Sequence, residues 1–206
     1  MPNATGVSSS IDARWLDALQ RLASRVAHEL RGALNGVSVN VEVVRSRAAK
    51  ATASAAALEP FADAASAQLD DVIELTEALL GLARPAREPV DVGTEVKRIV
   101  TLLSAAARAD SRRLTIDDVA ALNGLGTTSA PGSALRFVGC ECLLAAVEAS
   151  TKTRCVAVSD AASAAIRVET LDGETPSLPS DLVAVAAEWG IDIQVEPSAI
   201  SISFPR

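Results

Sequence analysis

Residues 21–36 read Arg21-Leu22-Ala23-Ser24-Arg25-Val26-Ala27-His28-Glu29-Leu30-Arg31-Gly32-Ala33-Leu34-Asn35-Gly36 and include the only histidine in a chain of 206 residues. Apolar residues recur at steps of three and four through and beyond this run, which predicts one stripe of an amphipathic helix. The stripe consists of Trp15, Leu19, Leu22, Val26, Leu30, Ala33, Val37, Val41 and Val44. His28 follows Val26 by two residues, about 200° around the helix axis, so its imidazole is predicted to face solvent beside Glu29.

Basic and small residues flank His28 on this outward face. Arg21 and Arg25 precede it by two turns and by one turn. Gly32 and Gly36 follow it by one turn and by two turns. Spacing alone leaves open whether this face binds a partner or is the solvated side of an ordinary helix.

The eight residues that begin at His28 resemble the H-box of two-component sensor histidine kinases. That box usually reads His, an acidic residue, Leu, Arg, Thr or Asn, Pro, Leu. The matching positions are His28, Glu29, Leu30, Arg31 and Leu34, and the departures are Gly32 and Ala33. The resemblance implies that His28 carries a phosphoryl group and that Glu29 orients and deprotonates its ring. It also implies weak or absent phosphatase activity, because Gly32 replaces the Thr or Asn that positions a hydrolytic water in the family.

The composition favours a folded, acidic protein of one or two domains. Hydrophobic residues make up 49% and charged residues 22%, which excludes a disordered chain. The net charge of −7 argues against nucleic acid as a partner, because phosphate binding needs basic surface. Aromatic residues make up only 2%, so a base-stacking platform is not expected.

We expect the protein in the cytoplasm. Met1 to Ser10 lack the basic and apolar regions of a signal peptide, and no apolar run reaches the roughly 18 residues that cross a membrane. The three cysteines, an odd number, suit a reducing compartment. Cys140-x-Cys142 lacks a second ligand pair, so we interpret both thiols as core residues and expect no metal.

The first half of the chain is predicted to form a helical hairpin over residues 11–84, after a flexible N-terminus at 1–10. Ser10 is the expected N-cap of a helix that runs to about Lys50, and 51–57 form a turn. A second helix runs from 58 to 83, with Pro60 in its first turn. A single hairpin leaves part of both stripes uncovered, so a homodimer that completes a four-helix bundle is expected.

Residues 88–206 are predicted to form an α/β sandwich with helices on one face of a sheet, which makes the whole fold α+β. The expected strands are 90–92, 114–116, 155–158, 165–168, 191–195 and 200–204. The expected helices are 96–108, a helix capped by Ser133, and 182–189, which Gly190 ends. Loops are expected from Asp117 and over 127–132.

This order of elements resembles the ATP-binding domain of histidine kinases in a degenerate form. On our alignment, Glu141 and Ala145 occupy the positions of the two Asn residues that ligate magnesium in that family, and Ala has no ligand atom. Asp172-Gly173 is either a remnant of one glycine-rich box or a plain turn, and a second box is missing. We therefore expect neither ATP nor another cofactor.

The combined pattern resembles the bundle-type histidine phosphotransferases, the ChpT-like class, which relay a phosphoryl group between receiver domains of response regulators. The implied partners are those receivers, which supply their own magnesium, and also a hybrid histidine kinase. An alternative is a non-catalytic pseudokinase or adaptor that binds a kinase or a response regulator.

The outward face of the first helix is our candidate surface for a receiver. Its basic members are Arg21, Arg25 and Arg31, which would complement an acidic receiver pocket or else form a solvated face. Its small, polar and apolar members, along which a receiver helix would lie, are Gly32, Asn35, Gly36, Val39 and Val43. The alternative for the valines is packing against the second helix.

Overall fold

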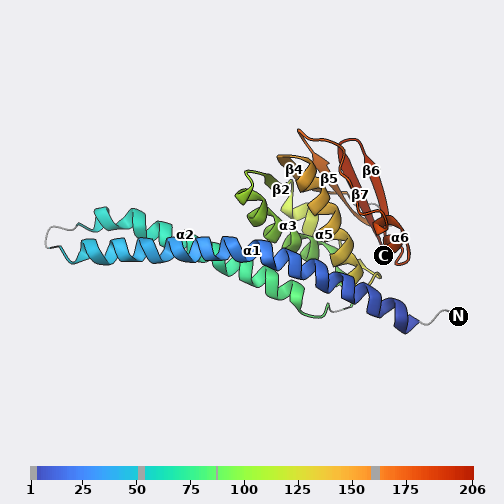
Figure 1. Cartoon of the computed structure of the whole chain (residues 1–206), viewed down its shortest axis with the longest axis horizontal. Helices are drawn as coiled ribbons and strands as arrows, with labels where there is room; N and C mark the ends of the chain where they lie inside the picture. Colours follow the sequence, from blue (N-terminus) through green and yellow to red (C-terminus); the bar gives the residue numbers. More distant parts are fainter. Residues whose placement is uncertain (1–3, 51–53, 87, 159–162) are drawn as a thin grey trace.

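The computed structural model describes residues 4–50, 54–86, 88–158 and 163–206 (Figure 1). Its helices are α1 (Ala4–Ala48), α2 (Ala55–Ala83), α3 (Val92–Ala109), α4 (Val119–Asn123), α5 (Gly132–Ala149) and α6 (Leu182–Ala187). Its strands are β1 (Val90–Asp91), β2 (Arg113–Ile116), β3 (Thr127–Thr128), β4 (Lys152–Ala157), β5 (Ser163–Thr170), β6 (Asp192–Glu196) and β7 (Ala199–Pro205). The α+β class is thus the observed one.

Helices α1 and α2 form the antiparallel hairpin, and its closed end projects away from the remaining elements (Figure 1). The N-terminal half of α1 packs instead on α3 and α5. Five apolar residues of that half are almost completely buried, and they are Ile11, Trp15, Ala18, Leu22 and Val26. The apolar stripe of α1 therefore packs on α3 and α5 in its N-terminal half and on α2 in its C-terminal half.

Both hairpin helices begin earlier than predicted. The prediction of Ser10 as N-cap is wrong, because α1 already begins at Ala4 and most of the expected flexible N-terminus is helical. Helix α2 begins at Ala55, so Pro60 lies beyond its first turn. The alanines at 55–57 favour the helix, and Ala56, whose carbonyl loses its helical donor at Pro60, is exposed to water. Residues 51–53 of the expected turn lie outside the described residues.

The second domain is a five-stranded sheet in the order β2-β4-β5-β7-β6. Strand β2 is parallel to β4, and the other neighbours are antiparallel. Alternate residues of β5 are buried, which is the pattern of a sheet covered on one face. Helices α3, α5 and α6 pack on that face, as predicted, and α1 packs on α3 and α5 (Figure 1).

The opposite face of the sheet carries charged side chains in ion pairs. Arg154 lies 2.6 Å from Glu169, and Arg167 lies 2.7 Å from Glu196. These four side chains are all partly exposed, which explains why polar residues alternate with the core positions along β4 and β5.

Several element ends in this domain differ from the prediction. Val92 begins α3 rather than ending a strand, and the expected loop at 127–132 contains β3, which pairs with β1. Pro131, not Ser133, is the N-cap of α5, and Asp118 caps the short helix α4 within an expected loop. These short pieces are stabilised by pairing and capping that no periodicity in the sequence signals. Helix α6 ends at Ala187 with Glu188 as its C-cap, two residues before the predicted end, and Gly190 lies in the turn that follows, with a φ of +70°.

A buried arginine joins the hairpin to the second domain. Arg136 on α5 is 4% exposed and lies 2.8 Å from Glu95 on α3, which is also buried. Its guanidinium also donates to the carbonyl oxygens of Leu82 at 3.0 Å and Arg84 at 2.7 Å. These carbonyls belong to the free C-terminal end of α2, so Arg136 caps the hairpin where the chain enters the second domain.

Candidate functional site

His28 lies on the outward face of α1, as the helical period predicts. Its side chain is 84% exposed, and its Nδ1 lies 3.4 Å from Oε1 of Glu29. Glu29 is more enclosed, with 25% of its side chain exposed. With Nδ1 facing a carboxylate, Nε2 is the ring nitrogen left open to a partner.

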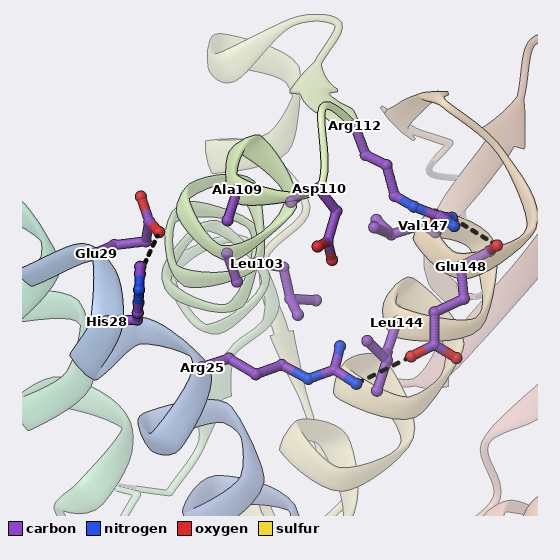
Figure 2. A pocket seen from close by; sticks show the side chains of 12 residues that line it. Arg25, His28, Glu29, Leu103, Ala109, Asp110, Arg112, Leu144, Val147 and Glu148 are labelled. Atoms are coloured by element: carbon purple, nitrogen blue, oxygen red, sulfur yellow. Dashed lines mark hydrogen bonds and ion pairs between the residues drawn. The ribbon is translucent and has the colours of Figure 1, made fainter. Parts of the chain in front are cut away.

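His28 also lines a cleft of about 460 Å³ between α1 and the C-terminal ends of α3 and α5. The other lining residues are Arg25, Glu29, Leu103, Ala106, Ala107, Ala109, Asp110, Arg112, Leu144, Val147 and Glu148. Figure 2 shows His28 and Glu29 side by side on α1, with Asp110 and Arg112 on the segment that follows α3. The site therefore combines groups from both domains.

An ion pair crosses this cleft. Arg25 extends from α1 to Glu148 on α5, and their charged atoms are 3.0 Å apart (Figure 2). Arg112 reaches the same end of α5 and donates to the backbone carbonyls of Val147 and Glu148. Arg112 thereby caps α5 and fixes the backbone position of Glu148.

The other two arginines of the predicted surface differ in their partners. Arg21 forms ion pairs with Asp17 on its own helix and with Glu141 on α5. Glu141 is largely buried, so this contact is part of the packing between α1 and α5. Arg31 is exposed and has no ion pair or hydrogen bond among the described residues, which leaves its guanidinium available to a partner.

The small and apolar members of the predicted surface divide into two groups. Gly32, Asn35 and Val39 are exposed, and Val39 is 62% exposed. The placement of Gly36 on the His28 face is wrong, because a Cβ built there would meet the side chain of Gln68 on α2. Eight residues after His28, the helix has turned about 80° beyond two full turns, so Gly36 faces the hairpin interior. Val43 is half-buried as well.

Residues aligned with the nucleotide site of kinases have other partners here. Glu141 pairs with Arg21, and Ala145 is buried in the core. Asp172 accepts hydrogen bonds from the Ser150 and Thr151 hydroxyls and from the Thr151 and Lys152 amides. The pKa of Asp172 is lowered to about 2, first by the Ser150 hydroxyl and then by Thr151. Asp172 therefore holds the turn between α5 and β4.

Gly173 is confined by the same turn. A Cβ built at Gly173 would overlap the carbonyl oxygen of Ala149 and the backbone of Ser150. The glycine thus permits the chain after β5 to approach the end of α5, and Asp172-Gly173 is a structural turn.

The cysteines are buried, as predicted, and burial raises the pKa of Cys140 and Cys155 to about 12. Among the described residues, no group of three or more His, Cys, Asp or Glu side chains is arranged to hold a metal ion. None of the described helices is long and apolar enough to cross a membrane.

The sequence reasoning missed the half of the site that the second domain supplies. Asp110, Arg112 and Glu148 lie far from His28 in sequence and belong to no recognisable motif. Their proximity to His28 comes from the packing of α1 across α3 and α5, which periodicity along one helix does not reveal.

No protein-family model matches the sequence, and no curated protein matches it at a significant level. Among solved structures, the fold is similar to the histidine kinase AdeS of Acinetobacter baumannii, with 12% sequence identity and a TM-score of 0.44. The match covers 86% of this chain and 97% of the AdeS chain.

Proposed function

We propose that this chain is a histidine phosphotransfer protein that relays a phosphoryl group between receiver domains through His28, without binding ATP. The observation that carries the proposal is the state of His28: it is the only histidine, 84% exposed, with Nδ1 facing Glu29 at the rim of a cleft. A nucleophile that attacks a group held by another protein needs this access. The resemblance of residues 28–35 to the H-box supports the same role.

In the forward step, the Nε2 lone pair of neutral His28 attacks the phosphorus of a receiver's aspartyl phosphate. The P–O bond to the aspartate breaks and its electron pair stays on the carboxylate, while a P–N bond forms. Nδ1 keeps its proton and donates it toward Glu29, whose negative charge offsets the positive charge that develops on the ring. Attack by the aspartate of a second receiver on the phosphohistidine reverses these changes and completes the relay.

Intramolecular contacts support a relay that does without ATP. Glu141 forms an ion pair with Arg21, and Ala145 offers no ligand atom. Asp172 already accepts hydrogen bonds from Ser150 and Thr151 in its turn. The carboxylates that the resemblance aligns with a nucleotide site therefore stabilise the packing of α1, α5 and β4. The phosphoryl group must then come from another phosphoprotein.

Two further features of the hairpin support the proposed partners. Arg31, Gly32, Asn35 and Val39 form an exposed strip beside His28 on which a receiver would dock. Large apolar side chains on other faces of the hairpin are about half exposed, and they are Leu34, Val41, Leu69, Ile73 and Leu80. Covering them against a second hairpin would complete a four-helix bundle, so we propose a homodimer.

The test is phosphoryl transfer from a panel of phosphorylated receivers to the purified protein. We expect label on the wild type and none on His28→Gln, with Arg47→Gln, on the same helix near its far end, as the matched control. Equal labelling of His28→Gln would contradict the assignment. Tight receiver binding without transfer would indicate the adaptor function instead, and saturable ATP binding would contradict the ATP-independent part of the proposal.

A further inference from the structure

The ion pair between Arg25 and Glu148 joins the two walls of the cleft that His28 lines. Arg25 lies one turn before His28 on α1, and both side chains line the same cavity. Glu148 reaches in from the end of α5, and Figure 2 shows Arg25 extending across the cleft toward it, away from the imidazole of His28.

This pair is held less firmly than the neighbouring contact of Arg21. The side chains of Arg25 and Glu148 are 47% and 57% exposed, whereas Glu141, the partner of Arg21, is 11% exposed. Solvent-exposed ion pairs contribute little to stability, so water or another anion replaces one partner at little cost.

A phosphoryl group on Nε2 of His28 would be a stronger partner for Arg25 than Glu148 is. It carries a charge of about −1.5 to −2 and presents oxygens that a guanidinium binds in a bidentate way. Side chains three residues apart on a helix start about 5–6 Å from each other, which is within the reach of arginine. The other acidic groups in the cleft, Glu29 and Asp110, increase the need for a cation there.

We propose that Arg25 exchanges Glu148 for the phosphoryl group on His28, so that their ion pair is a latch closed in the free protein and opened by phosphorylation. The proposal rests on the proposed function and names Arg25 as a residue that touches the reacting group. Glu148 acts through Arg25, because it holds the guanidinium away from His28 until the phosphoryl group arrives.

The experiment uses the whole 206-residue chain phosphorylated chemically with phosphoramidate, so it needs no receiver. Since His28 is the only histidine, a single phosphohistidine signal in the ³¹P NMR spectrum reports on it. The measured quantity is the pKa of the phosphoryl group in wild type, Arg25→Gln, Glu148→Gln and the double variant. Arg14→Gln is the matched control, because Arg14 also pairs with the second domain, at 2.7 Å from Asp181, about four turns away from His28.

We expect Arg25→Gln to raise the pKa of the phosphoryl group by about one unit, since a cation favours its doubly charged form. Glu148→Gln is expected to lower it, because Arg25 is then free. In the double variant the effect of Glu148→Gln should largely disappear, which separates release of Arg25 from simple removal of a negative charge. Arg14→Gln should leave the pKa unchanged.

Equal phosphoryl pKa values in all variants would overturn the latch. Shifts of the same sign in Arg25→Gln and Glu148→Gln would also overturn it, because that result is expected of an ion pair with a purely structural role. An undiminished effect of Glu148→Gln in the double variant would overturn it as well. These outcomes are independent of receiver labelling, so failure of the latch and failure of the phosphorelay role are distinguishable.

Discussion

The two glycines that follow His28 occupy different surroundings despite their similar spacing. A Cβ at Gly32 would meet nothing within 4 Å, whereas one at Gly36 would meet Gln68. Packing against Gln68 within the hairpin thus explains why position 36 is a glycine. No such contact explains the glycine at position 32, although glycine inside a helix costs roughly 0.8–1 kcal/mol relative to alanine. We propose that a partner approaches closely beside His28, which would explain the missing side chain at this position.

Gly32→Ala is therefore expected to stabilise the protein by about 0.8–1 kcal/mol in urea unfolding while weakening receiver binding measured by titration calorimetry. Gly36→Ala is the comparison, and it should be less stabilising because Gln68 must move. Unchanged receiver affinity in Gly32→Ala would remove this residue from the docking strip.

Asp172 gives a pH-dependent prediction at the same scale. Its pKa is lowered from 3.8 to about 2 in the folded protein, so its contribution to stability is complete above pH 3.8 and is lost as the pH falls toward 2. Asp172→Asn should lower the melting temperature at pH 7, and the difference from wild type should shrink below pH 3.8. A difference that persists undiminished near pH 2 would show that the carboxylate charge is not what holds the turn.

At the scale of elements, helix α5 is the piece against which the others are positioned. Its first half buries Arg136, which caps α2, and its last turn carries Glu148, which faces α1 across the cleft. Glu141 between them holds Arg21. Helix α5 thus fixes the position of both hairpin helices relative to the sheet. Because His28 lies on α1, α5 also fixes the position of His28.

Arg136→Met is expected to destabilise the protein by about 3–5 kcal/mol in urea unfolding, because it leaves Glu95 without its buried cation and the end of α2 uncapped. Arg98→Met provides the control. Arg98 also pairs with Glu95, at 2.7 Å, but its side chain is 35% exposed, so its loss should cost about 1 kcal/mol or less. Similar losses in both variants would mean that burial of the ion pair is not the dominant factor.

At the scale of the whole molecule, the hairpin is incompletely covered by its own chain. Leu69 and Ile73 lie one turn apart on α2 and are 47% and 49% exposed, although the second domain already packs on the base of the hairpin. Ordinary single surface apolar residues need no explanation, but a series along both hairpin helices is typical of an interface.

Ile73→Glu is expected to shift the protein from dimer to monomer in sedimentation equilibrium at micromolar concentration, because the charge would be buried between two hairpins. Leu171→Glu is the matched control, since Leu171 is 55% exposed but lies on the second domain, and it should leave the dimer intact. A wild-type protein that sediments as a folded monomer would contradict the homodimer.

The sequence by itself determined the α+β class, the two long N-terminal helices, the outward direction of His28 and the closing strands, because these follow from periods of 3.6 and 2 residues along a single element. It misplaced Ser10, Ser133 and Gly36. Helix ends depend on local competition for hydrogen bonds, and angular drift over eight residues moves a side chain to another face. Only the tertiary structure decided that Arg21 pairs with Glu141 and that Arg25 pairs with Glu148, because these contacts join residues more than a hundred positions apart. Such pairs are set by how α1 packs across α5, and no spacing within either helix encodes that packing.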